Sequence, residues 1–339
     1  MVIGSQSNNT LEIRDLVVEY RTRERVVHAV NSLSLTVGRG QTLGLVGETG
    51  AGKTTTGLAV MGLIPKPAGV VLGGAILLNG EDVLHKSDRE MKQIRGKTVS
   101  MIFQDPMSSL NPVMSIERQI SEAIRAHDRS LTRSQVLQKA HEMLEMVGIP
   151  RDRGSEYPHQ FSGGMKQRVV IAMALSCKPD LIIADEPTTA LDVTIQAQVL
   201  GLMKDLKDQY RTSMVMITHD LGIVAETCDS VSVMYAGSIV EHGTLHDVFD
   251  DPLHPYTKGL FGSLPRLDDR RAKLQPIKGL MPDPSNLPTG CTFWPRCDHA
   301  KDVCRVEKPN PTYFGGEHFV NCHLFNEEIS GARTVNMGD

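Results

Sequence analysis

The chain lacks the features that most directly indicate a nucleic-acid-binding or membrane-spanning protein. Its 339 residues include 36 Lys and Arg against 40 Asp and Glu, which gives a formal net charge of −4. Because nucleic-acid binders usually show a basic excess or stripe, this balance argues against that class. The longest purely apolar run, residues 169–175, is far shorter than the roughly 20 residues that a helix needs to cross a bilayer. The sequence therefore predicts no nucleic-acid partner and no spanning helix.

The N-terminus also lacks the layout of a targeting signal. Residues 1–10 are polar and do not show a charged segment followed by an apolar one, which a secretory signal requires. We therefore expect a disordered tail on a cytoplasmic protein. Aromatic residues make up only 4% of the chain, yet 40% hydrophobic and 22% charged residues are typical of a folded protein. This length and composition favour one large domain with an appendage.

Short apolar strands alternate with helical segments over the first three quarters of the chain. Strands are predicted at residues 11–20, 32–37, 42–46, 75–78, 98–103, 181–184, 214–217, 230–234 and 238–241. Helices are predicted at residues 53–64, after Ser162, at residues 193–210 and after Asp220. This alternation predicts an α/β fold with a largely parallel sheet that is covered on both faces.

Two stretches differ from this pattern. Residues 115–148 show a helical period, carried first by Ile116, Ile120 and Ile124, and predict a small helical subdomain inserted at about residues 105–165. Residues 251–322 hold 10 of the 18 prolines and no long periodic run. We therefore predict a core domain over residues 11–250 and a loop-rich C-terminal domain over residues 251–339.

A glycine-rich loop follows the apolar strand at residues 42–46. Residues 47–54 read Gly-Glu-Thr-Gly-Ala-Gly-Lys-Thr and match G-x-x-x-x-G-K-[ST], with a strand before and a helix after. In such a loop, backbone N–H groups surround the phosphates of a nucleotide. Lys53 neutralises their charge, and the Thr54 hydroxyl is offered to Mg²⁺. The sequence predicts a nucleoside triphosphate site here.

A buried strand at residues 181–184 runs into two carboxylates. Asp185 can hold Mg²⁺, and Glu186 can polarise an attacking water. An Asp-Glu pair after an apolar strand is often only a solvated strand end. In a chain that also carries a phosphate loop, however, the pair indicates hydrolysis.

The pentapeptide Phe161-Ser-Gly-Gly-Met165 offers a second set of backbone N–H groups at a predicted helix start. Because the phosphate loop already completes one site, this surplus element suggests that two chains close on each other's nucleotide.

Together these elements resemble the nucleotide-binding subunit of ATP-binding-cassette (ABC) transporters over about residues 11–325. The resemblance implies a phosphate-loop ATPase core with a mostly parallel sheet, an antiparallel β subdomain, the helical insert and the C-terminal domain. Its ATP-binding residues would be Tyr20 against adenine, then Gly47, Glu48, Thr49, Gly50, Ala51, Gly52, Lys53, Thr54 and Thr55. Its catalytic residues would be Glu186, His219 and Gln104, with Thr54, Gln104 and Asp185 around Mg²⁺.

The resemblance also assigns the residues that would lie at a dimer seam. Ser162, Gly163, Gly164 and Met165 match the family signature, which touches the ATP of the partner subunit. Asp192, in Ala190-Leu-Asp192, matches the loop that crosses the seam. Two residues depart from the commonest signature: Phe161 stands where leucine is usual, and Met165 where glutamine is usual.

Three further segments narrow the resemblance. They are Gln104-Asp-Pro-Met-Ser-Ser-Leu-Asn-Pro112, Gly163-Gly-Met-Lys-Gln-Arg168 and His254-Pro-Tyr-Thr257. They are similar to the D-type ATPase of bacterial oligopeptide and dipeptide importers, a branch whose relatives also import nickel, opines or glycosides. This branch implies a heterodimer with a paralogous F-type ATPase, two transmembrane permease subunits and, indirectly, an extracytoplasmic substrate-binding protein. The chain would lie peripherally on the cytoplasmic face of the membrane.

Four of the six cysteines cluster near the C-terminus. Cys291, Cys297, Cys304 and Cys322 follow the spacing C-x5-C-x6-C-x17-C. A [4Fe–4S] cluster is the favoured interpretation, because D-type importer ATPases with this tail resemble carriers of such clusters. Structural zinc and unligated or partly oxidised cysteines are the alternatives. An iron–sulfur cluster or a zinc ion would stabilise the fold of this loop-rich domain.

The sequence thus predicts an ATPase that energises import of oligopeptides or dipeptides. The same machine could import nickel or another small solute. A different class, a soluble ABC ATPase acting on nucleic acid or ribosomes, is the remaining alternative. A phosphate-loop kinase or GTPase would leave the pentapeptide and His219 unexplained.

Overall fold

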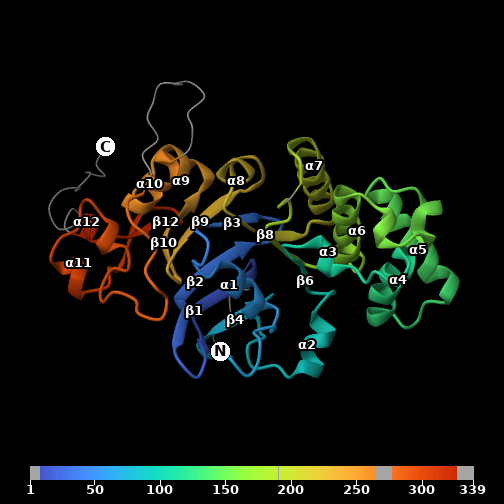
Figure 1. Cartoon of the computed structure of the whole chain (residues 1–339), viewed down its shortest axis with the longest axis horizontal. Helices are drawn as coiled ribbons and strands as arrows, with labels where there is room; N and C mark the ends of the chain where they lie inside the picture. The colour runs from blue at the N-terminus through green and yellow to red at the C-terminus, as the bar shows by residue number, and fades with distance from the viewer. Residues whose placement is uncertain (1–7, 190, 264–276, 327–339) are drawn as a thin grey trace, which may run out of the picture.

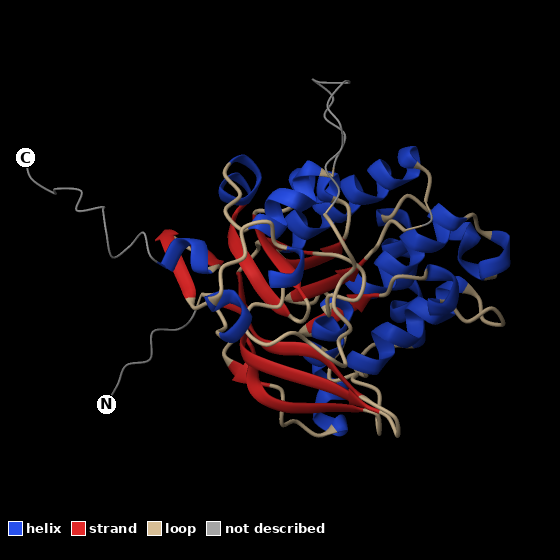
Figure 2. Ribbon diagram, turned by 60° about the vertical axis from the view of Figure 1, so that its left-hand side comes forward, coloured by secondary structure: helices blue, strands red, loops and turns tan. Residues whose placement is uncertain are grey.

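The computed structural model describes residues 8–189, 191–263 and 277–326, which form two sheets flanked by helices (Figures 1 and 2). The smaller sheet has the strand order β2-β1-β4-β5, and the larger has the order β11-β12-β10-β9-β3-β8-β7-β6. The strands are β1 Asn9–Arg21, β2 Val26–Gly38, β3 Thr42–Val46, β4 Gly69–Leu78, β5 Glu81–Asp82, β6 Val99–Ile102, β7 Leu181–Asp185, β8 Ser213–Thr218, β9 Ser230–Tyr235, β10 Ser238–Thr244, β11 Pro311–Gly315 and β12 His318–Asn321.

Twelve α-helices and three short 3-10 helices are found in the described part of the chain. They are α1 Lys53–Val60, α2 Asp88–Ile94, α3 Pro106–Ser109, α4 Ile116–His127, α5 Arg133–Met146, η1 Arg151–Ser155, η2 Pro158–Gln160, α6 Gly163–Leu175, α7 Val193–Tyr210, α8 Leu221–Thr227, α9 Leu245–Asp250, α10 Pro255–Gly262, η3 Trp294–Arg296, α11 Val303–Val306 and α12 His323–Asn326. Among the described residues, no helix combines the length and the apolar character that crossing a membrane requires.

The smaller sheet is antiparallel and follows the sequence pattern closely. Strand β1 pairs with both β2 and β4. In β2, Leu33, Leu35 and Val37 are buried while the serine and threonine residues between them are not, as a one-sided sheet requires. Strand β1 begins at Asn9, inside the segment predicted to be a disordered tail, and residues 1–7 of that segment lie outside the described residues.

The centre of the larger sheet is parallel. Strands β9, β3, β8, β7 and β6 run in the same direction, and β3, β7 and β8 are buried along their whole length. Both faces of these strands are covered, which explains why they are continuous apolar runs. The predicted α/β class is therefore confirmed. Because parallel strands end at one edge, the segments after β3, β7 and β8 converge there.

The helical insert forms one end of the molecule, with α4 and α5 farthest from the sheets (Figure 1). Ile116, Ile120 and Ile124 of α4 are buried, as are Val136 and Ala140 of α5. The helical period read from the sequence is thus the packed face of this insert. The predicted helix after the glycine-rich loop is shorter than expected, since α1 ends at Val60 rather than residue 64.

The C-terminal region occupies the opposite end (Figure 1), and it is attached to the core by strand pairing. Strand β12 pairs antiparallel with β10, and β11 pairs with β12, so this region extends the larger sheet. Glu241 of β10 is completely buried, and its carboxylate accepts hydrogen bonds from the backbone N–H groups of Leu253 (2.7 Å) and His254 (2.9 Å). The proline-rich sequence did not predict this strand pairing. Pro311 begins the edge strand β11, where a missing backbone N–H is tolerated.

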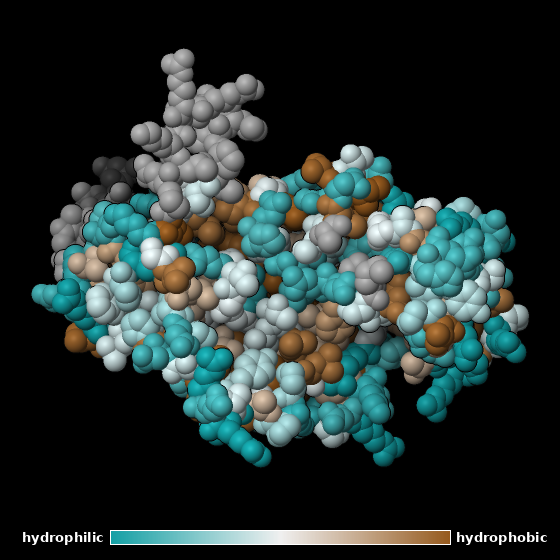
Figure 3. All heavy atoms as spheres, in the orientation of Figure 1, coloured by the Kyte–Doolittle hydropathy of each residue, from teal (hydrophilic) through white to brown (hydrophobic). Residues whose placement is uncertain are grey.

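The face shown in Figure 3 is mostly hydrophilic, with hydrophobic residues in small separate areas. Four large apolar side chains of the described residues are more than two thirds exposed: Val113, Val193, Leu280 and Val306.

Candidate functional site

The glycine-rich loop lies between β3 and α1, and two of its glycines have no room for a side chain. Gly47 has φ 153°, and a Cβ there would come within 2.1 Å of the Met234 carbonyl oxygen. Gly52 has φ 104°, and a Cβ there would come within 2.2 Å of the Ala29 carbonyl oxygen. Both contacts are with backbone, which cannot move aside as a flexible side chain could. The loop conformation therefore requires glycine at both positions.

Lys53 opens α1 and folds back onto the loop. Its Nζ donates hydrogen bonds to the carbonyl oxygens of Gly47 (2.7 Å) and Glu48 (3.1 Å). The residue is only 7% exposed, and this burial lowers the pKa of the ammonium, against the opposing charges of Glu186, Asp185 and Glu48. A desolvated cation held at the loop is a strong partner for phosphate oxygens.

Asp185 ends strand β7 and is almost completely buried. The Thr54 hydroxyl donates to its Oδ1 over 3.2 Å. Burial raises the pKa of the Asp185 carboxyl, and the neighbouring Glu186 acts in the same direction, while Thr54 and Lys53 lower it. A hydroxyl and a carboxylate oxygen thus meet beside the phosphate loop, and such oxygen ligands are those that Mg²⁺ accepts.

Glu186 is held by side chains from three separate segments. Gln104 Nε2 donates to Oε2 (3.0 Å), the Thr189 hydroxyl donates to the same oxygen (2.9 Å), and His219 Nδ1 lies 2.9 Å from Oε1. Burial by itself would raise the pKa of Glu186. The hydrogen bonds from His219 and Thr189, with the charges of His219 and Lys53, outweigh burial and leave that pKa below its ordinary value.

The backbone of Glu186 is also unusual. Its φ is 46°, a left-handed conformation that is rare outside glycine, and its N–H donates to the Ile217 carbonyl of β8 over 2.8 Å. Non-glycine residues in this region cost about 1–3 kcal/mol and cluster at functional sites. Thr189 was missed by the sequence reasoning, although it stands three residues after Glu186, where a turn returns the chain to that carboxylate.

Tyr20 lies at the end of β1, near the start of α1. Its hydroxyl is 3.4 Å from the Thr55 hydroxyl, so the ring is brought beside the residues that follow the phosphate loop. The structure therefore places Tyr20, Lys53, Asp185 and Glu186 around one edge of the two sheets.

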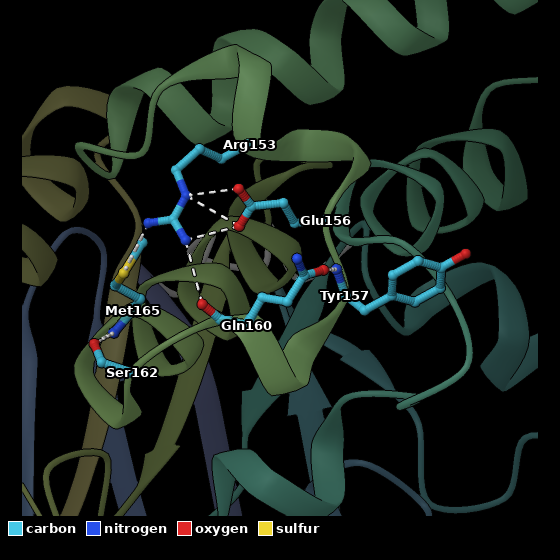
Figure 4. Close-up of polar contacts among 6 residues, drawn as sticks. All are labelled: Arg153, Glu156, Tyr157, Gln160, Ser162 and Met165. Carbon is cyan, nitrogen blue, oxygen red and sulfur yellow. Dashed lines mark hydrogen bonds and ion pairs between the residues drawn. The ribbon is translucent and has the colours of Figure 1, made fainter.

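The pentapeptide enters helix α6. Ser162 is the N-cap of α6, and its hydroxyl accepts a hydrogen bond from the Met165 N–H over 3.4 Å (Figure 4). Ser162 and Gly163 are exposed, so the helix start is open to another molecule. In the described part of the chain, no hydrogen bond joins these residues to the phosphate loop.

Arg153 of η1 holds the segment that leads into α6 (Figure 4). Its guanidinium pairs with Glu156 (2.7 Å), donates to the Gln160 carbonyl (3.2 Å) and donates to the Met165 sulfur (3.4 Å). It also lies over the Phe161 ring, with 4.7 Å between Cζ and the ring centroid. The two residues that depart from the commonest signature, Phe161 and Met165, thus contact the same arginine. An Arg and a Glu three residues apart are common on any surface, so the sequence carried no signal for this role.

Helix α7 packs beside the start of α6. A Cβ at Gly164 would come within 2.5 Å of Ile195 Cγ2, so glycine allows this close approach. Asp192 is the N-cap of α7 and accepts a hydrogen bond from the Ile195 N–H over 3.0 Å. Ala190, the first residue of the predicted seam loop, lies outside the described residues.

The predicted metal site of the four C-terminal cysteines is wrong. In the described ranges, which contain Cys291, Cys297, Cys304 and Cys322, no group of three or more His, Cys, Asp or Glu residues could hold a metal ion. All four thiols are free. Burial, with a smaller contribution from neighbouring thiols, raises the pKa of Cys291 and of Cys322 to about 11. The described residues therefore bring together too few ligands for an iron–sulfur cluster or for structural zinc, each of which takes four.

The chain matches two known families. Residues 30–189 match the family described as ABC transporter. Residues 240–304 match the family described as oligopeptide/dipeptide transporter, C-terminal region.

Curated relatives match nearly the whole chain. The oligopeptide transport ATP-binding protein AppD of Bacillus subtilis is 48% identical over 320 residues, which cover 94% of this chain and 97% of that protein. The dipeptide transport ATP-binding protein DppD of the same organism is 47% identical, with 95% and 96% covered. The oligopeptide transport ATP-binding protein OppD of Salmonella typhimurium is 46% identical, with 91% and 92% covered.

Two solved structures share the core fold. The dimeric bacterial ABC transporter cassette MJ0796 superposes with a TM-score of 0.62 at 24% identity and covers 69% of this chain and 98% of its own; at that identity it shows the fold alone. The cbiO1 protein from Clostridium perfringens, part of the ABC transporter complex cbiONQ, also has a TM-score of 0.62, at 26% identity, with 72% and 92% covered.

Proposed function

The chain belongs to the family of ATP-binding proteins of oligopeptide and dipeptide ABC transporters, and from this premise we propose that it energises a membrane importer for oligopeptides or dipeptides. The observation that carries the proposal is similarity to peptide transport ATP-binding proteins over 91–95% of the chain, together with the match of the C-terminal region to its own peptide-transporter family. As an ABC ATPase the chain uses ATP as its substrate. Such subunits work with membrane permeases and a substrate-binding protein, so we place this chain peripherally on the cytoplasmic face of the membrane.

We assign ATP to the loop between β3 and α1. The N–H groups of the loop and Lys53 would hold the phosphates, with Tyr20 against adenine. The close-packed glycines and the desolvated lysine support this assignment. The residues assigned to ATP are Tyr20, Gly47, Glu48, Thr49, Gly50, Ala51, Gly52, Lys53, Thr54 and Thr55.

Mg²⁺ would be held by Thr54, Asp185 and Gln104. The hydroxyl and carboxylate that already meet at 3.2 Å supply the hard oxygen ligands this ion requires. When bound, Mg²⁺ neutralises charge on the phosphate oxygens.

We propose that Glu186 polarises the water that attacks the γ-phosphate. Its lowered pKa keeps the carboxylate ionised at neutral pH, and three hydrogen-bonding side chains fix its orientation. His219 would contact the γ-phosphate, and Gln104 would connect the site to the helical insert. Phosphoryl transfer depends mostly on positioning and electrostatics, which such a fixed carboxylate provides.

We further propose that the nucleotide site is completed by a second ATPase. Ser162, Gly163, Gly164 and Met165 would cap the ATP of a paralogous F-type partner, and Asp192 would lie at the seam. The exposure of Ser162 and Gly163 at the start of a 13-residue helix supports this proposal, since the positive end of such a helix favours phosphate.

Reconstitution of the whole transporter in proteoliposomes tests the function. Binding protein loaded with a peptide should stimulate ATP hydrolysis several-fold, and binding protein loaded with nickel should not. Stimulation of ATP hydrolysis only by the nickel-loaded binding protein would show that the cargo is a metal and not a peptide. ATP hydrolysis that responds to nucleic acid, and not to any binding protein, would overturn the transport function. Peptide transport relatives favour neither alternative.

A further inference from the structure

The C-terminal region reaches back to the phosphate loop through Arg296. The guanidinium forms a two-pronged ion pair with Glu48: Nη1 lies 3.0 Å from Oε2 and Nη2 lies 3.2 Å from Oε1. Its Nε donates to the Lys278 carbonyl over 2.9 Å. The Arg296 side chain is only 7% exposed and that of Glu48 29%. A fork-to-carboxylate pair of this kind is strong and directional because little water competes with it.

Tyr256 holds the backbone of the same residue. Its hydroxyl accepts a hydrogen bond from the Glu48 N–H over 2.9 Å. The Tyr256 ring is completely buried and packs against Tyr235, with 4.7 Å between ring centroids, and against Phe293, with 5.5 Å. Both the backbone and the side chain of Glu48 are therefore fixed by residues 208 and 248 positions later in the chain.

Glu48 is itself one of the residues assigned to ATP. Glu48 follows Gly47, and the Lys53 ammonium donates to the carbonyl oxygens of both. The negative charge of Glu48 also acts on the pKa of Lys53. A change in the position of Glu48 would therefore move the carbonyls that orient the lysine.

A second segment of the C-terminal region supports the same end of the site. The His28 N–H of β2 donates to the Pro284 carbonyl over 2.8 Å. The Met281 methyl lies 3.0 Å from where a Cβ of Gly50 would be. The C-terminal region thus contacts both the phosphate loop and a neighbouring strand.

We propose that Arg296 and Tyr256 are positioning residues for nucleotide binding, which act through Glu48 on the first turn of the phosphate loop. The proposal rests on the ATPase function proposed above and adds a task for the C-terminal region: it sets how well the loop is pre-organised for phosphate, and therefore the affinity for ATP. The alternative is a purely structural contact, which stabilises the fold and leaves the affinity for ATP unchanged.

A double-mutant cycle on the full-length chain separates the two. Arg296→Ala, Glu48→Gln and the double variant are compared by the Kd for a fluorescent ATP analogue with Mg²⁺. Each single change should weaken binding by about tenfold, a typical coupling between sites. The double variant should bind no more weakly than either single, because both remove one interaction. Arg296→Lys should restore affinity only in part, since it keeps the charge and loses the fork.

Two further variants keep the test decisive. Tyr256→Phe removes only the hydroxyl that accepts the Glu48 N–H, and it should weaken binding even if Arg296→Ala fails to fold. Arg305→Ala is the matched control: its guanidinium lies 5.3 Å over the Trp294 ring in the same region. It should leave the Kd unchanged. In the reconstituted transporter, the KM for ATP should rise in the Arg296 and Tyr256 variants while kcat stays within about twofold.

The outcomes are distinct. Suppose that wild-type protein binds ATP, and that the Arg296, Glu48 and Tyr256 variants have a lower melting temperature but the wild-type Kd. The contact is then purely structural, and the inference is wrong. If wild-type protein itself does not bind ATP, the proposed function fails instead.

Discussion

At the scale of single residues, Glu186 combines several features that each cost folding free energy and that are typical of functional sites. It adopts a left-handed backbone conformation, it is mostly buried, and its carboxylate accepts hydrogen bonds from Gln104 and Thr189 and contacts His219. Burial and hydrogen bonding act on its pKa in opposite directions, and hydrogen bonding wins. The Glu186 carboxylate is therefore protonated at a lower pH than an ordinary glutamate.

Replacement of this carboxylate is the most direct test at that scale. Glu186→Gln keeps the shape and removes the charge that polarises water, so ATP hydrolysis should fall by about 10²–10⁴-fold. Binding of ATP, measured by equilibrium titration, should be unchanged. Glu145→Gln, at an exposed ion pair with Arg151, is the control. Hydrolysis near the wild-type rate in Glu186→Gln would remove Glu186 from its assigned role.

At the scale of elements, the start of α6 depends on the loop before it. Arg153 ties η1 to the residues on both sides of Ser162 through Gln160, Phe161 and Met165. Because these contacts already fix the start of α6, its N–H groups need no further ordering when a partner binds. This lowers the entropic cost of association.

Removal of the arginine tests this arrangement. In the assembled transporter, Arg153→Ala should lower ATP hydrolysis by about tenfold, which corresponds to about 1.4 kcal/mol of lost positioning. Nucleotide binding to the separate chain should not change. Arg151→Ala is the matched control, because Arg151 belongs to the same short helix but pairs with Glu145. Equal hydrolysis in the two variants would show that Arg153 does not position the signature.

Helix α10 has a cap that makes stability depend on pH. His254 is its N-cap and accepts the Tyr256 N–H at Nδ1 over 3.0 Å, which requires a neutral ring. Burial lowers the pKa of His254 to about 3, whereas an unfolded histidine titrates near 6.5. Between these values the unfolded chain binds a proton that the folded chain does not. Stability should therefore fall by up to about 1.4 kcal/mol per pH unit as pH decreases from about 6.5.

An asparagine can serve the same cap without titrating. His254→Asn should make the free energy of unfolding less dependent on pH between about 4.5 and 6.5, by close to one proton. Denaturant unfolding at several pH values measures this slope. Burial also lowers the pKa of His242, so some slope should persist. An unchanged slope in His254→Asn would mean that His254 is not the group that titrates.

At the scale of the whole molecule, the helical insert and the C-terminal region lie at opposite ends, on either side of the central sheet (Figure 1). Ser162 is exposed at the start of α6, and Arg296 of the C-terminal region contacts Glu48 of the phosphate loop. We expect this division to place the signature and the chain's own nucleotide in different composite sites of one heterodimer.

A bulky cation at the signature tests that geometry. Ser162→Arg should impair hydrolysis at the partner's site by at least about tenfold, because it blocks the helix start where phosphate would lie. The Kd of the chain's own nucleotide should stay the same. Single-site inactivation of one subunit at a time, followed by hydrolysis assays, distinguishes the two sites. Loss of nucleotide binding by the separate variant chain would contradict the cross-subunit assignment.

The sequence by itself determined the features that depend on neighbouring residues. The spacing of glycines and lysine at residues 47–54, the alternation in β2 and the helical period of α4 each record a local geometry, and the predicted α/β class and family membership are confirmed. The roles of Glu186, His219 and Ser162 came from the family resemblance and stay predictions.

Only the tertiary structure decided which distant side chains meet. Arg296 reaches Glu48 across 248 positions, β12 adds to the central sheet beside β10, and the four C-terminal thiols do not form a metal site. Cysteine spacing records that thiols are available but not how they converge, and an arginine in a proline-rich loop carries no periodic signal. Such contacts are set by the packing of whole elements, which is why the sequence predicted a nucleotide site and only the fold revealed which distant residues contact its loop.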